Sequence, residues 1–549
     1  MVIDRLPLFT WIPLVVNELS ESRFEKNACV VAFILALLIA GWFRFSQIQL
    51  RPFHHDEGVN SFFLLNLAHT GEYKYDPTNY HGPSLYYFAF VLLRIFGEND
   101  FALRLSPVLF GLLTVAMVWL LRRQLGAVGT PVAAFCMAVS PCLVFYSRYF
   151  IHEMSFGCFS LGIVVGMWRY AQDKKFQWLA LAASSLGLLL TTKETAVITL
   201  AVFLVGIVCA TILDATKSLI QQRRFSPATL VKELKNDTVS ILPSLDHALA
   251  AAIITVFIFV FFYSSAFKHW QGVSDFFRAI AHWTQERSSN DHVKIFWYYL
   301  GILFKVEFPL LIGSLLAGVF IIWRGNRFWL FTGAWVLGLV LAYSKIPYKT
   351  PWLMLSFIVP MALVCGYMAE QLYRLLPFWA LKFAWIIVVV FAFVACGRLA
   401  WKVNFDKYDD NSNESGYFVE FGKKHEWRPY IDGQYGYVYA HTDREFLALI
   451  EEIKREAESF PEKKQTGIYV ASSQHWPLPW YLRDYPSTAY NGTWPGVAGE
   501  PLAIPQKIIV AGTEQQSNLN GVSGWRISSR AYKLRPGVEL VLFVREESK

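Results

Sequence analysis

Repeated apolar segments constrain the fold of this chain more than any other feature. Most are about 20 residues long, which lets a helix cross a hydrocarbon core about 30 Å thick. Hydrophobic residues make up 54% of the 549 residues and charged residues only 17%, which leaves too little polar surface for a soluble protein of this length. The sequence therefore predicts an α-helical polytopic membrane protein. Its eleven predicted spans are 27–49, 101–121, 129–146, 154–171, 176–192, 195–214, 247–266, 298–323, 328–343, 351–373 and 379–400.

Basic residues and cysteines argue against several function classes. The formal net charge is +8, but the Lys and Arg side chains fall between apolar segments and form no patch on a polar domain, so we expect no nucleic-acid partner. All seven cysteines lie in apolar segments without CxxC spacing, and we interpret them as small core residues. No GxxxxGK or GxGxxG follows a strand-like segment and no DxD triplet occurs, which gives no support for a soluble nucleotide substrate.

The distribution of Lys and Arg predicts the topology. The apolar segment 84–97 is only about 14 residues long and carries Arg94 near its end, so we interpret it as an interfacial helix that does not cross. With the N-terminus inside, every inner loop is then basic, as the positive-inside rule requires. An odd number of spans places the chain after residue 400 outside, on the same face as the first outer loop, 50–100. We expect an integral protein of the cytoplasmic (plasma) membrane.

The composition changes near residue 401. We divide the chain into a transmembrane domain, 1–400, and a soluble extracytoplasmic α/β domain, 401–549. The second domain has a helical pattern at 443–460. Its strand-like segments are YGYVYA (435–440), GIYVAS (467–472), KIIVAG (507–512) and VELVLFV (538–544).

Residues 51–60, RPFHHDEGVN, place ionisable side chains directly after the first span. In one interpretation Asp56 only N-caps a short interfacial helix that Gly71 ends. In the other, a carboxylate at the hydrocarbon boundary serves as a general base for a hydroxyl. One residue can do both. His54 and His55 also suggest a metal site, although adjacent histidines in a loop are a weak signal.

Several motifs resemble a known superfamily. The D-E pair, the helix after it, HGPSLYY (81–87) and FALRL (101–105) are similar to GT-C glycosyltransferases of the family 39 type, which include the protein O-mannosyltransferases and the lipid A aminoarabinose transferase. HHDEG (54–58), PYKTPWL (347–353) and WPLPWYLRDY (476–485) look most similar to the flippase-activity-associated, or Agl-type, membrane proteins. The resemblance covers most of the chain.

The resemblance implies a function. It implies a mannosyltransferase-like enzyme whose donor is a sugar on a polyprenyl phosphate, with inverting transfer to a hydroxyl of a protein, glycan or lipid acceptor on the outer face. Such enzymes need no nucleotide. Asp56 matches the family's catalytic aspartate, which deprotonates the acceptor, and Glu57 is second in line as a positioning or acceptor-binding group. His81 stands where the aminoarabinose transferase has a glutamate implicated in metal binding, so His55 and His81 are candidates for substrate binding or for a divalent metal ion.

The lipid phosphate needs cations at the membrane surface. Lys193, in LLLTTKETA, matches a lysine of the aminoarabinose transferase, although a snorkelling loop lysine would look the same. SKIPYKTPWL resembles a second family stretch and supplies Lys345, Tyr348 and Lys349. Arg148 is a further candidate, with an ordinary ion pair to Glu153 as the alternative.

Two other function classes stay open. Many spans with intramembrane charge can line the pathway of a lipid-linked sugar transporter or flippase-associated protein, but no inverted repeat of broken apolar segments is evident. A non-catalytic membrane scaffold whose outer domain binds partner subunits is the second alternative, although the candidate catalytic carboxylate, Asp56, is present.

Overall fold

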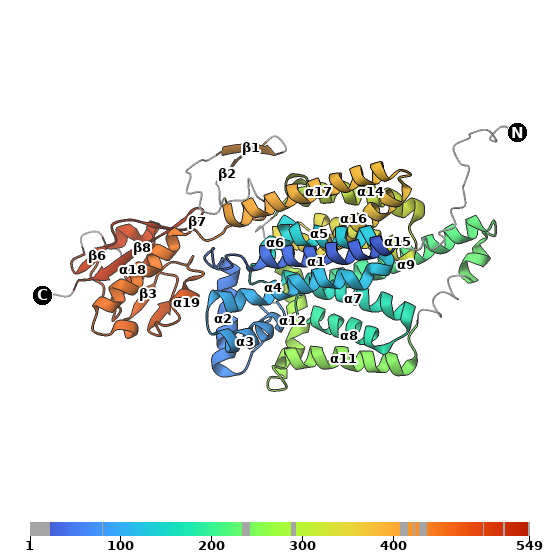
Figure 1. The fold of residues 1–549 in the computed structure, drawn as a ribbon. Coiled ribbons are helices and arrows are strands. Elements are labelled where there is room, and N and C mark those ends of the chain that lie inside the picture. The colour runs from blue at the N-terminus through green and yellow to red at the C-terminus, as the bar shows by residue number, and fades with distance from the viewer. Residues whose placement is uncertain are drawn as a thin grey trace.

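The structure consists of a long helical bundle and a small sheet domain at one end of it (Figure 1). It is a computed structural model that describes residues 22–79, 81–232, 242–286, 293–406, 416–420, 423–427, 436–497, 499–519 and 522–546. Figure 1 shows α2 (His55–Thr70) and α3 (Ser84–Phe96) at the same end of the bundle as the sheet.

Every predicted span coincides with a helix or with a pair of consecutive helices. They are α1 (Arg23–Phe45), α4 (Asp100–Met117) with the 3-10 helix Val118–Leu121, α5 (Arg122–Val139) with α6 (Pro141–Tyr146), α7 (Glu153–Asp173), α8 (Phe176–Leu190), α9 (Ala196–Gln221), α11 (Leu245–Tyr263), α13 (Tyr298–Val306) with α14 (Phe308–Arg324), α15 (Arg327–Lys345), the 3-10 helix Pro351–Met354 with α16 (Leu355–Leu375), and α17 (Trp379–Trp401). After α11 comes α12 (Gln271–Glu286), and after α17 the π-helix Lys402–Asp406.

The number of crossings is smaller when only length and hydropathy are considered. Seven stretches of the described chain are long and apolar enough to cross a membrane, or eight if α13 and α14, bent by 112°, form one span. One of the seven, Asp100–Val139, holds two predicted spans, because the chain reverses near Gly126, whose φ is 78°. Both of its ends lie by the end of α1: Arg104 donates to the Ile48 carbonyl, and Arg44 to that of Ala138. The count of eleven stays a prediction.

The short apolar segment inside the first outer loop is a helix, as predicted. α3 has 13 residues and therefore a length of about 20 Å, which is less than a hydrocarbon core needs. Its length agrees with the prediction that this segment does not cross.

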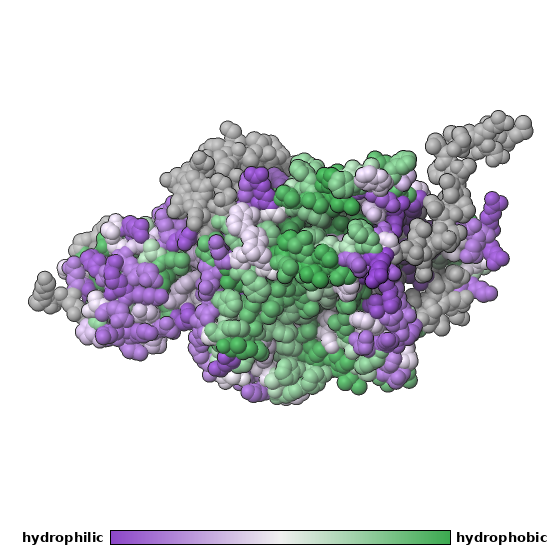
Figure 2. Space-filling model, viewed as in Figure 1, coloured by the Kyte–Doolittle hydropathy of each residue, from purple (hydrophilic) through white to green (hydrophobic). Residues whose placement is uncertain are grey.

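On the face of the bundle that Figure 2 shows, apolar side chains form a broad band, with polar side chains towards both ends. α11 and α17 lie at the periphery, since none of their most apolar stretch is buried inside the protein. Phe257 on α11 and Phe391 on α17 are among the exposed side chains. Helices that satisfy their own backbone groups and expose such a band are suited to a lipid bilayer.

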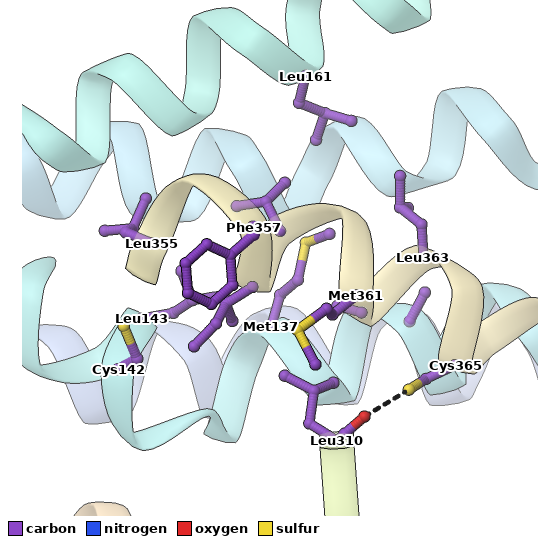
Figure 3. Close-up of a cluster of buried hydrophobic side chains, with 14 of the residues drawn as sticks. Met137, Cys142, Leu143, Leu161, Leu310, Leu355, Phe357, Met361, Leu363 and Cys365 are labelled. Carbon is purple, nitrogen blue, oxygen red and sulfur yellow. Dashed lines mark hydrogen bonds between the residues drawn. The ribbon is translucent and has the colours of Figure 1, made fainter. Parts of the chain in front are cut away.

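α16 is the central helix of the bundle. Its most apolar stretch is 94% buried. Figure 3 shows Leu355 and Met361 of α16 packed among side chains of its neighbours, which include Met137 of α5 and Leu310 of α14. The Cys365 thiol donates to the Leu310 carbonyl over 3.4 Å. Because PYKTPWL leads directly into α16, this close-packed core holds that stretch in place.

The C-terminal domain is built on a mixed sheet. Its strands, β3 (Ile468–Val470), β4 (Thr488–Tyr490), β5 (Ile508–Gly512), β6 (Trp525–Ile527), β7 (Tyr532–Arg535) and β8 (Val538–Arg545), have the order β4-β3-β5-β8-β6, with β7 also paired to β8. β3 runs parallel to β4 and β5, whereas β8 is antiparallel to its partners. The helices are α18 (Glu445–Ser459) and α19 (Leu478–Tyr481), with 3-10 helices Lys463–Gln465 and Thr513–Leu519. A separate pair, β1 (Gly416–Glu420) and β2 (Lys423–Trp427), precedes them.

Three of the four predicted strand segments form strands, and the predicted helix is α18. The fourth, YGYVYA, was predicted wrongly, because its described residues, 436–440, form a turn and extended chain. Tyr437 is buried against the bundle, and its hydroxyl donates to Glu307 over 3.2 Å. The Tyr439 carbonyl lies 3.0 Å from His54 Nε2. Tyr437 and Tyr439 therefore contact the bundle and not a neighbouring strand.

Candidate active site

One cavity of about 570 Å³ lies where the bundle meets the C-terminal domain. Five chain segments of the bundle line it: the start of α2, the loop before α3, the turn before α7, the turn after α8, and the stretch between α15 and α16. Residues 439–440, Gln474 and Arg535 close it from the C-terminal domain. The predicted site residues that reach this cavity are His55, Asp56, His81, Lys193 and Tyr348.

The N-terminus of α2 places Asp56 at the cavity. His54 is the N-cap, and its Nδ1 accepts a hydrogen bond from the Asp56 backbone N–H over 3.1 Å. The prediction that Asp56 itself is the cap was wrong, whereas Gly71 does end the helix, with φ 70°. The Asp56 side chain lies in the first turn and is 36% exposed, and the N-terminal end of the helix favours its negative charge there.

Glu57 points away from the cavity into the protein. Its carboxylate forms two hydrogen bonds of 2.7 Å with the Arg104 guanidinium, and it accepts from the backbone N–H groups of His54 and Phe150 over 3.0 Å. The side chain is 1% exposed. Glu57 therefore holds the start of α2 in place and does not line the cavity, and its positioning role in the reaction stays a prediction.

A glycine in HHDEG lets the C-terminal domain approach α2. A Cβ atom on Gly58 would lie 2.7 Å from Pro477 Cβ and 2.8 Å from Pro477 Cα. Pro477 belongs to WPLPWYLRDY, so this stretch and HHDEG are in direct contact. On the same side, Phe53 stacks on Trp480, with ring centroids 5.2 Å apart, and the Thr442 hydroxyl donates to the Phe53 carbonyl.

The HGPSLYY loop packs against the TTKET turn. Gly82 N–H donates to the Thr192 carbonyl and Ser84 N–H to that of Thr191, over 3.1 and 3.0 Å. A Cβ on Gly82 would lie 2.2 Å from the Thr191 oxygen, so only glycine fits. This contact brings His81 Nδ1 to 3.0 Å from Glu194 Oε2.

Lys193 is buried and paired at the cavity. Its Nζ donates to Glu153 Oε1 over 2.5 Å, and the side chain is 5% exposed. Burial alone would lower the pKa of Lys193, but the Glu153 and Glu194 carboxylates outweigh burial and raise it. Burial would raise the pKa of Glu194, but His81 and Lys193 outweigh it and lower that pKa. The snorkelling alternative for Lys193 is therefore wrong, because its ammonium is held inside the protein as a cation.

Only some of the polar side chains of PYKTPWL line the cavity. Tyr348, Thr350 and Trp352 line the cavity, and the buried Thr350 hydroxyl has no hydrogen-bond partner among the described residues. Lys349 does not reach it, because its Nζ donates to the carbonyls of Lys294 and Ile346 over 3.0 and 2.5 Å. Lys345 is exposed at the end of α15, outside the cavity.

Arg148 is likewise a structural residue and not part of the cavity lining. Its guanidinium donates to the carbonyls of Phe43, Arg44, Ser46 and Gln47 at the end of α1 and lies over the Phe405 ring. These carbonyls have no partner within the helix, and a cation at a helix C-terminus stabilises them. The predicted phosphate contact and the alternative ion pair with Glu153 are both wrong, since Glu153 pairs with Lys193.

Sequence reasoning missed the side chains that the C-terminal domain supplies. Arg535, at the end of β7, has its Nη1 3.4 Å from Nδ1 of His55, a residue 480 positions away. Its Nη2 donates to Gln474 Oε1. Burial lowers the pKa of His54 and of His55 to about 4, so both rings are neutral near pH 7. The sequence RPG, which begins at Arg535, predicts only a turn and indicates no substrate contact.

The described side chains do not fit a metal site. A catalytic zinc usually has three protein ligands. Across the described ranges, no group of three or more His, Cys, Asp or Glu side chains could hold a metal ion. His81 Nδ1 already faces Glu194, and the Arg535 guanidinium beside His55 Nδ1 disfavours a second cation there. We therefore assign no step to a metal ion.

The cavity offers a half-exposed carboxylate between two walls. The bundle supplies one wall, which includes Lys193, Tyr348 and Thr350, whose side chains can donate hydrogen bonds to an anion. The C-terminal domain supplies the other wall, which includes Arg535 and Gln474. Asp56 is placed to accept a proton from a hydroxyl between these walls.

Comparisons with known proteins were made at the levels of sequence and structure. The sequence model of the dolichyl-phosphate-mannose-protein mannosyltransferase family matches residues 80–226. This stretch includes HGPSLYY, FALRL and Lys193. A search of curated protein sequences gives no significant match.

Two solved membrane proteins are similar in structure. ArnT from Cupriavidus metallidurans, bound to undecaprenyl phosphate, matches with a TM-score of 0.59 and 14% identity over 93% of this chain and 97% of that one. The archaeal oligosaccharyltransferase AglB from Archaeoglobus fulgidus, in complex with an inhibitory peptide and a dolichol-phosphate, matches with a TM-score of 0.53 and 13% identity over 90% of this chain and 70% of that one. Identity this low shows a shared fold. The chain therefore has the GT-C fold that its sequence motifs predict.

Proposed function

We propose that this protein is a membrane glycosyltransferase that moves a sugar from a polyprenyl-phosphate-linked donor to an acceptor hydroxyl. One observation carries the proposal: HHDEG, HGPSLYY and PYKTPWL, which lie far apart in the sequence, line a single cavity with Asp56, and WPLPWYLRDY packs against HHDEG beside it. The undecaprenyl phosphate bound to ArnT and the dolichol-phosphate bound to AglB support a lipid-phosphate donor.

Asp56 acts as the general base in this proposal. Its carboxylate takes the proton of the acceptor hydroxyl as the oxygen attacks the anomeric carbon. The bond from that carbon to the lipid phosphate oxygen breaks on the opposite side, so the anomeric configuration inverts. The polyprenyl phosphate leaves with the electron pair of the broken bond, and Asp56 keeps the proton until solvent removes it.

The bundle wall of the cavity binds the donor phosphate. Lys193 supplies the charge, and the hydroxyls of Tyr348 and Thr350 supply neutral hydrogen bonds. The ammonium of Lys193 has three N–H donors and uses one for Glu153 in the structure, so it can contact a phosphate oxygen and keep this ion pair. His55 and His81 line the same cavity and contact the sugar or the acceptor.

The proposal includes an orientation. The N-terminus lies inside, and the cavity and the C-terminal domain lie on the outer face of the plasma membrane, because this arrangement leaves the basic loops inside. The acceptor is a protein, glycan or lipid, the transferred sugar is mannose-like, and partner subunits can bind the outer domain.

Transfer of label tests the function. The purified protein in lipid nanodiscs is incubated with a panel of radiolabelled undecaprenyl-phosphate and dolichyl-phosphate sugars and with membranes as acceptor. We expect label to move to an acceptor from at least one donor, with an inverted anomeric configuration by NMR. If no donor of the panel binds to the wild-type protein, the proposal is wrong.

Thiol labelling tests the orientation. Ser459 is exposed on α18 and Gln222 is exposed after α9. We expect Ser459→Cys to react with an impermeant thiol reagent in intact cells and Gln222→Cys to react only after permeabilisation, with the wild-type chain as the background for its own cysteines. The reverse pattern would show an inverted topology.

A further inference from the structure

Arg535 stands out among the cations of the cavity because its partners are neutral. Its Nη1 lies 3.4 Å from His55 Nδ1 and 3.5 Å from the Trp476 carbonyl, distances that are long for hydrogen bonds. Its Nη2 donates to the amide oxygen of Gln474. Among the described residues, no carboxylate forms an ion pair with Arg535, whereas Lys193 is paired with Glu153.

A rigid hairpin holds this guanidinium at the cavity. Arg535 pairs with Val538 across the turn Pro536–Gly537, and Gly537 has the positive φ, 77°, that such a turn requires. The hairpin is tied to the start of α18, since Asp443 N–H donates to the Leu534 carbonyl over 2.8 Å. The side chain is half-buried. Its position is therefore set by the sheet.

The chemistry of a guanidinium indicates which kind of ligand Arg535 would bind. Its planar set of donors matches the two oxygens of a carboxylate or phosphate and gives short, charge-assisted hydrogen bonds. A half-buried arginine with neutral partners gains most from a ligand that brings a negative charge. The Asp56 carboxylate in the same cavity favours the charged form of Arg535 through space, but among the described residues the two side chains form no direct ion pair.

Two substrates could bring such an oxyanion, the donor and the acceptor. The donor phosphate belongs to the bundle wall by the function proposed above, on which this step rests. Arg535 belongs to the wall that the C-terminal domain supplies, beside His55 and close enough to Asp56 to feel its charge, and Asp56 is the base that the acceptor hydroxyl must reach. We propose that Arg535 binds a phosphate or carboxylate group of the acceptor, and that the acceptor of this protein is therefore anionic close to the hydroxyl that is glycosylated.

Binding of two probes tests the proposal without any need for transfer. Methyl phosphate has no lipid tail and reports an oxyanion site, and undecaprenyl phosphate reports the donor site. Binding of each to the full-length protein in detergent is followed by tryptophan fluorescence, since Trp352 and Trp476 lie at or beside the cavity. Methyl phosphate is titrated after the donor site has been saturated with undecaprenyl phosphate, so that it reports the second site alone.

Arg535→Met should weaken the binding of methyl phosphate at least about 10-fold and leave the binding of undecaprenyl phosphate unchanged. Arg535→Lys should weaken the binding of methyl phosphate less. Arg530→Met removes the same charge from an exposed residue of the same domain and should change neither. Equal methyl phosphate binding by wild type and Arg535→Met would overturn the proposal. A loss confined to undecaprenyl phosphate would also overturn it and place Arg535 in the donor site. Failure of the wild-type protein to bind undecaprenyl phosphate would contradict the proposed function and still leave the methyl phosphate titration interpretable.

Discussion

The two walls of the cavity differ in how their charges are balanced. On the bundle wall, Lys193 is paired with Glu153, and Glu194 with His81, so the charges are compensated before any substrate binds. On the wall of the C-terminal domain, Arg535 has only neutral partners. A preformed ion pair fixes a cation at one place, whereas an unpaired guanidinium favours ligands that carry a negative charge. The comparison indicates that the bundle wall positions a ligand and that the domain wall selects one.

The walls also differ in the kind of contact that holds them in place. The bundle wall is held by backbone hydrogen bonds between the HGPSLYY loop and the TTKET turn. The domain wall is held mainly by side chains, through Phe53 on Trp480 and through the Trp480 indole N–H, which donates to Asp100 over 2.7 Å. Asp56 lies between them. Each variant below changes one wall, the attachment of one wall, or the carboxylate between the walls.

We expect the largest effect from Asp56→Asn. The change keeps the size of the side chain and its place in the first turn of α2 but removes the proton acceptor, so transfer should fall by about two to four orders of magnitude. Transfer is measured at saturating donor, and the melting temperature should stay near that of the wild type. Retention of more than about a tenth of wild-type turnover would contradict the general-base role.

Glu57→Gln should have the opposite effect to Asp56→Asn: it should lower stability and not the chemistry of transfer. It leaves the Arg104 guanidinium buried without a carboxylate, which costs about 3 to 5 kcal/mol of folding stability. The melting temperature in detergent should fall clearly, and the protein that remains folded should keep donor binding. A stable Glu57→Gln protein that has lost transfer would show that Glu57 takes part in the chemistry after all.

These two carboxylates show where prediction from the sequence ends. HHDEG predicts a site at the end of the first span, but adjacent residues of a helix point about 100° apart, and the sequence does not show which one faces the cavity. The residue that decides it is Arg104, in FALRL, which takes Glu57 into the protein. The spans, the interfacial helix and most of the bundle wall were predictable, because each depends on a local pattern.

Contacts between distant segments were not predictable in the same way. Arg148 binds backbone carbonyls at the end of α1. Every residue has a backbone carbonyl, so the sequence does not show which of them an arginine will bind. YGYVYA has the alternation of a strand, although Tyr437 and Tyr439 contact the bundle. Arg535 reaches the cavity only because the sheet docks on α2, so no spacing in the chain relates it to Asp56.

Removal of the Lys193 charge tests the bundle wall. Lys193→Met alone would leave Glu153 buried without a partner, so we pair it with Glu153→Gln. The double variant should fold and bind undecaprenyl phosphate about 10 to 100 times more weakly, the loss of one charge-assisted contact. Lys217→Met is the control, since Lys217 lies at the far end of α9 and donates to the carbonyls of Ile321 and Gly325. If Lys345→Met weakens the binding of undecaprenyl phosphate more than the double variant does, the phosphate site lies at the end of α15.

Gly58→Ala tests whether the distance between the walls matters. A Cβ at this position meets both the side chain and the backbone of Pro477, so the domain wall must shift away from α2. Displacements below 1 Å are enough to disturb a catalytic geometry, and we expect transfer to fall about 10-fold while donor binding is unchanged. Gly41→Ala in α1 is the control, because a Cβ there meets nothing within 4 Å. Equal transfer by the two variants would show that the domain wall is not needed at a fixed distance.

The smallest effect concerns His54, which joins the two walls. Its Nδ1 accepts from the Asp56 N–H, so Nε2 carries the proton and donates to the Tyr439 carbonyl over 3.0 Å. The ring performs both tasks only when it is neutral, and burial keeps it so by lowering its pKa from 6.5 to about 4.

Because this pKa is lower in the folded protein than in the unfolded chain, the unfolded chain binds the proton first on acidification. The contribution of His54 to stability is therefore complete above about pH 6.5 and is lost as the pH falls towards 4. His54→Asn keeps an oxygen that can cap α2 and removes the titration. We expect its melting temperature to fall by a few degrees less than that of the wild type between pH 7 and pH 5. Burial also lowers the pKa values of His55, His152, His441 and His475, and these side chains contribute to the slope that remains. Parallel melting curves for the two proteins would show that protonation of His54 does not separate the walls.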